Sequence, residues 1–235
     1  MKLTTQQINQ LYLFTRQHYV EYYDLQTELV DHLANAIETE WQQNPKLTFD
    51  EVLNKEFKKF GVFGFMSVVE SRQAALGKKY NSIVWEHFKE FFGIPKIVLT
   101  LAMTFLLFII LKISSYQEWT IIGLYLALFG FTIYEMIKSK RLRNKKKKSQ
   151  QKRWLFEEII NQYGAFSGAI LLPFNIILQI FNRIDTHITN DYFLLAICFV
   201  LVLLSVSLFI IFKIIPSKTQ TYLEQTYPEY KYEKL

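Results

Sequence analysis

The sequence contains a single cysteine, Cys198, among its 235 residues. One cysteine excludes a disulfide bond within the chain and a thiolate metal cluster. The first ten residues, MKLTTQQINQ, lack the apolar stretch of a secretory signal peptide. We therefore expect the first apolar segment, far along the chain, to act as its own membrane-insertion signal.

Motifs that carry common chemistry are also absent. The chain has no Walker-type glycine loop, no G-x-S-x-G nucleophile motif and no HExxH zinc motif. The apolar segments contain no ionisable residue near their centres, which argues against proton-coupled transport. Glu135, Glu157 and Glu158 lie near segment ends, where we expect them to face interfacial lysines or a helix N-terminus.

What the chain does have is apolar sequence, since 51% of its residues are hydrophobic. Residues 1–92 are mixed and charged, as in a soluble domain, whereas 93–215 contain windows long enough to span a bilayer. The pattern predicts an all-α protein with a cytosolic helical domain and a four-helix transmembrane bundle. The predicted spans are 94–111, 120–137, 164–181 and 192–215. For the third span, which contains Pro173, we prefer a transmembrane helix to a re-entrant segment.

A strongly basic run, KSKRLRNKKKKSQQKR at 138–153, separates the second and third spans. The positive-inside rule makes it a cytoplasmic loop and places both chain ends, including the tail 216–235, in the cytoplasm of a bacterial inner membrane. Its default role is contact with anionic lipid headgroups, followed by docking of an acidic protein, and nucleic-acid binding is least favoured. The basic residues are Lys138, Lys140, Arg141, Arg143, Lys145, Lys146, Lys147, Lys148, Lys152 and Arg153.

Four helices are predicted before the first span. Thr4 with Gln7, and Thr48 with Glu51, form capping boxes, while Asp24 is predicted to cap the helix that runs to 43. In that helix Leu25, Leu29, Leu33, Ile37 and Trp41 recur every four residues as an apolar stripe. The third helix is predicted to end at Gly61, in the left-handed conformation of a helix stop, and the fourth spans about 63–92. The tail is expected to be loosely ordered or to lie along these helices.

Small and amide residues mark one face of the second and third spans. Small residues let helix backbones approach closely, and an amide hydrogen-bonds across such a contact. Packing within the bundle is the simpler interpretation, and an oligomer interface or a polar path is the functional one. The residues are Gly123, Ala127, Gly130, Gly164, Gly168, Asn175 and Gln179.

The second helix carries acids that we expect to face a cytosolic partner, namely Glu28, Asp31, Glu38 and Glu40. Glu28 and His32 lie one turn apart and could together hold a metal ion. Because no second ligand pair is visible, a structural role for His32 is favoured, and we predict no metal, no cofactor and no catalytic residue.

Two strings at 22–40 and 47–61, YYDLQTELVDHLANAIETE and LTFDEVLNKEFKKFG, carry a family resemblance. The region that contains them, roughly residues 5–65, resembles the HAAS-type helical domains found ahead of transmembrane helices in bacterial proteins. The resemblance implies a role in regulation and protein contact and implies no catalytic residue. The chain departs from the usual LG-x-P ending, because it reads FGVFGF and adds a long helix. The chain also looks like a class of four-span proteins of low-GC bacteria, which adds no mechanism.

We therefore predict a non-enzymatic membrane protein that acts as a regulatory or scaffold subunit, with a protein partner or a second copy of itself. One alternative is a small transporter or channel subunit with a path past Gly123, Gly130, Asn175 and Gln179. Another is a lipid-acting enzyme built on the three interfacial glutamates. The sequence also predicts a salt-sensitive contact between the basic run and the acidic second helix.

Overall fold

The computed structural model describes residues 2–148, 152–163 and 190–234, and every regular element in these ranges is a helix. The N-terminal region consists of α1 (Thr5–Gln17), α2 (Tyr23–Gln43) and α3 (Phe49–Lys58). The long helix α4 (Met66–Glu90) leads away from it towards α5 (Lys96–Ile113). Helix α6 (Gln117–Lys148) and the short α7 (Leu155–Asn161) follow. The predicted all-α class is confirmed for these residues.

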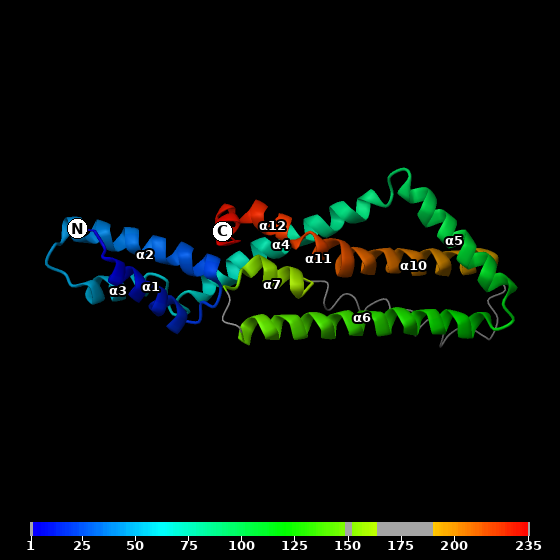
Figure 1. The fold of residues 1–235 in the computed structure, drawn as a ribbon, viewed down its shortest axis with the longest axis horizontal. Coiled ribbons are helices and arrows are strands. Elements are labelled where there is room, and N and C mark those ends of the chain that lie inside the picture. Colours follow the sequence, from blue (N-terminus) through cyan, green and yellow to red (C-terminus); the bar gives the residue numbers. More distant parts are fainter. Residues whose placement is uncertain (1, 149–151, 164–189, 235) are drawn as a thin grey trace.

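The last part of the chain returns to the N-terminal region. Helix α10 (Asp191–Phe209) passes through a π-helical turn, η1 (Ile210–Ile214), into α11 (Ile215–Ser217). Helix α12 (Thr219–Thr226) and a 3₁₀ segment, η2 (Pro228–Lys234), complete it. Figure 1 shows an elongated molecule, with α1–α3 at one end, α5, α6 and α10 at the other, and α4, α7 and α12 between them. The 25 residues of α4 extend about 37 Å, which is enough to join the two ends.

Three described helices are long and apolar enough to cross a membrane: α5, α6 and the continuous helix 191–217. This indicates a multi-pass membrane protein. They match three of the four predicted spans, and the remaining one, 164–181, lies outside the described residues.

Several helix boundaries have the local features that the sequence predicts. Thr4 and Thr48 each accept a hydrogen bond from the backbone three residues on, completing both capping boxes. Gly61 has a φ of +76°, the left-handed conformation expected of a helix stop. The apolar stripe of α2 is buried along its whole length. The predicted Asp24 cap is wrong: Tyr22 is the N-cap residue, and Asp24 lies inside the first turn with its carboxylate turned to other segments.

The basic run differs from the expected loop over much of its length. Helix α6 continues without a break from its apolar part to Lys148. Lysine and arginine are good helix formers, and their charge is favourable at a helix C-terminus. Acids of α7 also pair with this stretch, Glu157 with Lys146 and Glu158 with Arg143. The predicted second span and the start of the basic run are therefore one 32-residue helix.

The tail is helical rather than loosely ordered, and it follows the alternative in which it lies along the helical domain. Leu223 and Tyr227 are 1% and 6% exposed. One hydrophobic cluster runs from Leu11 of α1 through α2, α3, α4 and α7 to Tyr227. A second, smaller cluster joins α5, α6 and α10 around Leu111, Ile121 and Cys198. Helix α1 and the described part of the tail are thus held in the same core.

Candidate functional site

Three distant chain segments meet at Asp24, in the first turn of α2. Its side chain is buried, and its Oδ1 accepts a 3.1 Å hydrogen bond from the backbone N–H of Leu155 at the start of α7. Its Oδ2 accepts a 2.8 Å hydrogen bond from the Tyr227 hydroxyl in the tail. Asp24 therefore accepts a hydrogen bond from a backbone N–H that has no partner within α7, and it anchors the C-terminal segment through Tyr227. We call this meeting point the Asp24 junction.

Aromatic rings enclose the junction. Trp154 is 2% exposed, and its ring centroid lies 5.4 Å from that of Tyr23, 4.8 Å from Tyr227 and 5.3 Å from Tyr230. The backbone N–H of Tyr23 donates a 2.7 Å hydrogen bond to the Arg153 carbonyl. The end of the basic run is thus joined to the start of α2 by backbone as well as by side chains.

Burial governs the acid–base properties of the junction. Desolvation raises the pKa of Asp24 above its usual value, and the hydrogen bonds from Tyr227 and Leu155 oppose that shift without cancelling it. Burial also raises the pKa of the Tyr227 hydroxyl, and the neighbouring charge of Asp24 adds to the shift. The tyrosine therefore stays protonated and remains the donor of the pair.

A mixed-charge pocket of about 690 Å³ opens on one side of the junction, between α2, α4 and the tail. Two of the predicted partner-facing acids, Glu28 and Asp31, line it. Arg72 of α4 forms a 2.8 Å ion pair with Glu28, and Lys79 donates a 2.9 Å hydrogen bond to the Thr226 hydroxyl.

A second pocket, of about 480 Å³, lies where α1, the start of α2, the end of α6 and residues 152–153 converge. Four cationic side chains and one carboxylate, Glu21, are among its lining residues. We call it the basic pocket. Its lining residues are Arg16, Val20, Glu21, Tyr23, Gln26, Lys147, Lys152 and Arg153.

The predicted basic residues therefore divide by role. Arg143 and Lys146 form ion pairs with the glutamates of α7. Arg153 pairs with Glu158 of α7 and with Glu21, which lies between α1 and α2. Lys147, Lys152 and Arg153 line the basic pocket. The remainder of the run on α6 is exposed, comprising Lys138, Lys140, Arg141, Lys145 and Lys148. The predicted contact between the basic run and the acids of the second helix is not formed by Glu28, Glu38 or Glu40, which have other partners. The basic run instead meets the start of α2 through the Tyr23 backbone, and Arg153 pairs with Glu21, which precedes that helix.

Those four acids have other surroundings. Glu38 accepts a 2.9 Å hydrogen bond from the backbone of Leu3, and Glu40 pairs with Lys55 at 2.7 Å. Glu28 pairs with Arg72, so three of the four serve contacts within the chain, and Asp31 is exposed. The interfacial glutamates face basic residues as expected, since Glu135 pairs with Lys213 at 2.7 Å in addition to the α7 pairs.

The small residues of α6 lie on its outer surface among the described residues. Gly123, Ala127 and Gly130 are exposed, and a Cβ atom at either glycine would meet no described atom within 4 Å. Ala127 lines an apolar groove of about 540 Å³ between α5, α6 and α10. Their predicted counterparts lie outside the described residues, so the contact stays a prediction: Gly164, Gly168, Asn175 and Gln179.

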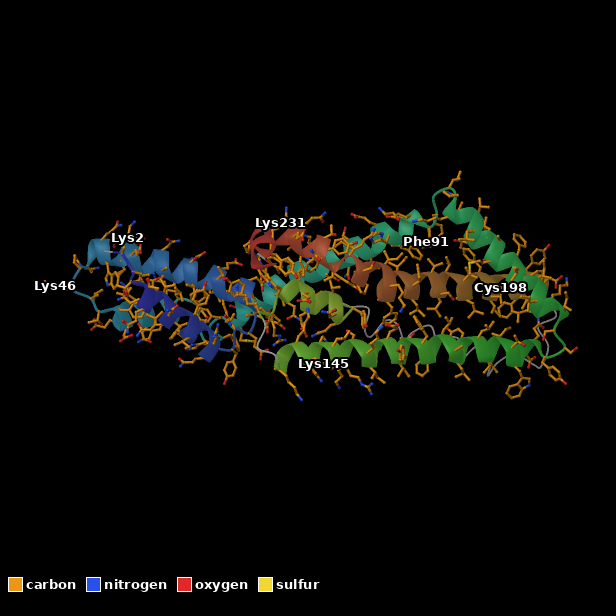
Figure 2. The ribbon with its side chains drawn as sticks, viewed as in Figure 1. Lys2, Lys46, Phe91, Lys145, Cys198 and Lys231 are labelled. Atoms are coloured by element: carbon orange, nitrogen blue, oxygen red, sulfur yellow. The ribbon has the colours of Figure 1, made fainter. Side chains whose placement is uncertain are left out.

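Metal-ligating side chains do not gather in the described ranges, where no group of three or more His, Cys, Asp or Glu residues is found. The His32 ring instead packs edge-on against Phe60, with centroids 5.9 Å apart. Cys198 is fully buried on α10 in the apolar half of the molecule (Figure 2).

An exposed apolar surface lies on the helical domain, away from the apolar helices. Tyr19 is 81% exposed, Val62 98% and Phe63 79%. These residues lie next to the same cluster of rings. His18, which precedes Tyr19, has its ring centroid 6.0 Å from that of Phe65, which follows the 61–64 turn. We call Tyr19, Val62 and Phe63 the apolar patch.

Tyr19 has an unusual backbone. Its φ is +64°, and it occupies the position after the α1 C-cap where glycine is preferred. Its backbone N–H donates a hydrogen bond to the Arg16 carbonyl. The N–H of Val20 donates one to the Thr15 carbonyl, which completes a Schellman motif. A non-glycine residue there is strained by about 1–3 kcal/mol. Sequence reasoning missed Tyr19, and the only available signal was an aromatic residue where a helix stop requires glycine.

Comparison with protein-family models, curated proteins and solved structures finds no match for this chain. The HAAS-type resemblance therefore stays a prediction from the residues at 22–40 and 47–61.

Proposed function

We propose that this chain is a non-enzymatic bacterial inner-membrane protein whose cytosolic helical domain binds another protein as a regulatory or scaffold subunit. The observation that carries the proposal is Tyr19, an exposed aromatic residue held in a strained conformation that glycine would relieve. Such strain, persisting where the ring adds little to the fold, is characteristic of functional surfaces. Val62 and Phe63 extend the same apolar patch, as protein-binding sites do.

The distribution of charge supports the proposed orientation. Helix α5 begins, and α6 and α10 end, on the side of the apolar helices that faces the helical domain (Figure 1). Lys96, Lys213 and the basic run all lie there, whereas the opposite end has the neutralised pair Lys112–Asp191. By the positive-inside rule, this distribution supports a cytoplasmic position for the helical domain and the tail. Lys138, Lys140 and Arg141 follow the apolar part of α6 directly, where they would contact anionic headgroups.

The substitution Tyr19→Gly tests the proposal, because it should separate binding from stability. Relief of the left-handed strain, less the roughly 1 kcal/mol by which glycine's backbone entropy favours the unfolded chain, is expected to keep or raise the free energy of unfolding by up to about 2 kcal/mol. The loss of the ring is expected to reduce recovery of the partner when the intact protein is purified from its native membrane in mild detergent. The measurements are thermal unfolding and quantitative mass spectrometry of the co-purified proteins.

Leu13→Ala is the matched control, since Leu13 is 55% exposed on α1 and has ordinary helical geometry outside the patch. It should leave co-purification unchanged. If the native protein purifies without any partner, or if Tyr19→Gly retains the full amount, the proposed function is wrong.

A further inference from the structure

The basic pocket is lined by side chains that are already held in place. The buried amide of Gln26 accepts a 3.3 Å hydrogen bond from the Arg16 Nε and donates a 2.6 Å hydrogen bond to the Val20 carbonyl. The Arg16 guanidinium is thus fixed through one nitrogen, and its terminal nitrogens have no partner among the described residues. Lys152 lies over the Tyr23 ring, 4.2 Å from its centroid.

Charge in the pocket is unbalanced. Arg16 and Lys147 form no ion pair with any described acid, while Arg153 is shared between Glu21 and Glu158. Arg16 and Lys147 therefore contribute two positive charges that no described acid neutralises, which suits a ligand with at least two negative charges. Arginine binds phosphate oxygens through two parallel hydrogen bonds, and lysine binds them as a point charge. A volume of about 480 Å³ lies within the range of small-molecule sites.

We propose that the basic pocket binds the phosphate groups of a water-soluble, multiply charged anion, such as a phosphorylated metabolite or a nucleotide. The same chemistry is present in lipid headgroups, but depth disfavours them. The apolar part of α6 ends at Ile137, and Lys147 lies ten residues further, about 15 Å along the helix axis. A tilt of about 20° shortens this only to about 14 Å. The headgroup layer is roughly 5–8 Å thick on each side, so the pocket opens beyond it.

The walls of the pocket come from both halves of the molecule. Arg16 and Gln26 belong to the helical domain, whereas Lys147 lies in the last turn of α6, the helix that crosses the apolar region. A bound anion would therefore bridge α1 and α6. It would also compete with Glu21 for the Arg153 guanidinium. Ligand binding is thereby coupled to how the helical domain is held against the membrane helices.

Pyrophosphate is a suitable probe, titrated calorimetrically into the intact protein in phosphatidylcholine nanodiscs at about 0.15 M salt, where long-range attraction is screened beyond about 8 Å. Saturable binding is expected. Lys147→Gln and Arg16→Gln should each weaken it by about tenfold or more, the effect of losing one charge-assisted hydrogen bond. Glu21→Gln should strengthen it severalfold, because the competing carboxylate is removed.

Lys145→Gln is the matched control. It removes the same charge from the same helix two residues earlier, and residues two apart face different sides of a helix. The Lys145→Gln variant should bind pyrophosphate with an affinity within about twofold of that of the unsubstituted protein, as expected for an exposed charge. Equal weakening by Lys145→Gln and Lys147→Gln would show unspecific attraction and overturn the proposal. So would an absence of pyrophosphate binding combined with Lys147-dependent binding to phosphatidylglycerol vesicles, which would assign the pocket to lipid. Thermal unfolding of each variant verifies that the fold is retained.

Discussion

In the helical domain Leu25 and Leu33 are fully buried, whereas on α5 Leu99 and Leu106 expose 60% and 61% of their surface. The domain buries its apolar side chains against its own helices and against the tail. In the apolar helices, only 17% of the 18-residue apolar stretch of α5 and 22% of that of α6 are buried within the protein. The same residue type thus serves a core closed on itself at one end and a surface that suits lipid at the other. The contrast explains why amphipathic spacing is present in α2 and absent from α5.

The largest expected effect sharpens this contrast by making one substitution at both ends. Leu33→Ala removes a fully buried side chain and should lower the free energy of unfolding by about 2–5 kcal/mol, through lost burial and a residual cavity. Leu106→Ala, on the exposed face of α5, should change it by less than about 0.5 kcal/mol. Denaturation of the intact protein in detergent, followed by circular dichroism, measures both. Equal losses would mean that the two ends are not packed differently.

A smaller effect is expected at the Asp24 junction, where the two ends are tied together. Asp24→Leu leaves the Leu155 N–H and the Tyr227 hydroxyl buried without their acceptor, which should destabilise the protein by about 2 kcal/mol. Release of the tail is expected to accompany it and to appear as faster proteolysis after residue 218. Glu28→Gln is the control, because its exposed pair with Arg72 contributes less than about 1 kcal/mol. A Glu28 variant as unstable as the Asp24 variant would argue against a special role for the junction.

Asp24 also predicts a direction of pH dependence. Burial makes its folded-state pKa higher than the ordinary 3.8, so the folded protein holds the proton more tightly than the unfolded chain does. Stability should therefore fall as pH rises from 3.8 through the raised pKa, and should be level above it. Asp24→Asn, which keeps an acceptor oxygen for Leu155, should remove this slope. The charged or titratable groups facing the junction are Tyr227, Glu28, Asp31, Arg72, Lys79 and Glu229.

Features set by nearby residues were predictable from the sequence. The capping boxes at Thr4 and Thr48, the stripe of α2 and the stop at Gly61 depend on spacings of a few residues, and the apolar helices depend on composition alone. Asp24 was misassigned for the opposite reason. Its position just before an apolar stripe is enough to suggest a helix cap, whereas its actual partners, Leu155 and Tyr227, lie 131 and 203 residues away.

The candidate sites follow the same rule. The charge of the basic run is visible in the sequence, but the pocket needs Arg16 and Gln26 of the first two helices, and no local pattern links them to Lys147. The continuation of α6 to Lys148 was obscured because a dense charge run was interpreted by topology rather than by helix propensity. Acids on α7 stabilise that continuation, and they too are separated from it in sequence.

The smallest effect concerns two ion pairs at opposite ends of the apolar helices. Glu135 on α6 is 7% exposed and pairs with Lys213 in the π-helical turn, whereas Lys112 and Asp191 are both more than half exposed. Lys213→Met should destabilise the protein by about 1–2 kcal/mol, because it leaves a buried carboxylate unpaired. Glu135→Gln should have a smaller effect, since it removes the buried charge, and combining the two should restore part of the loss. Lys112→Met should change the unfolding free energy by less than about 0.5 kcal/mol, because water solvates both partners of the exposed pair. A double-mutant cycle measured by unfolding in detergent gives these values. A larger effect at Lys112 than at Lys213 would contradict the view that the apolar helices are more tightly joined at the end nearer the helical domain.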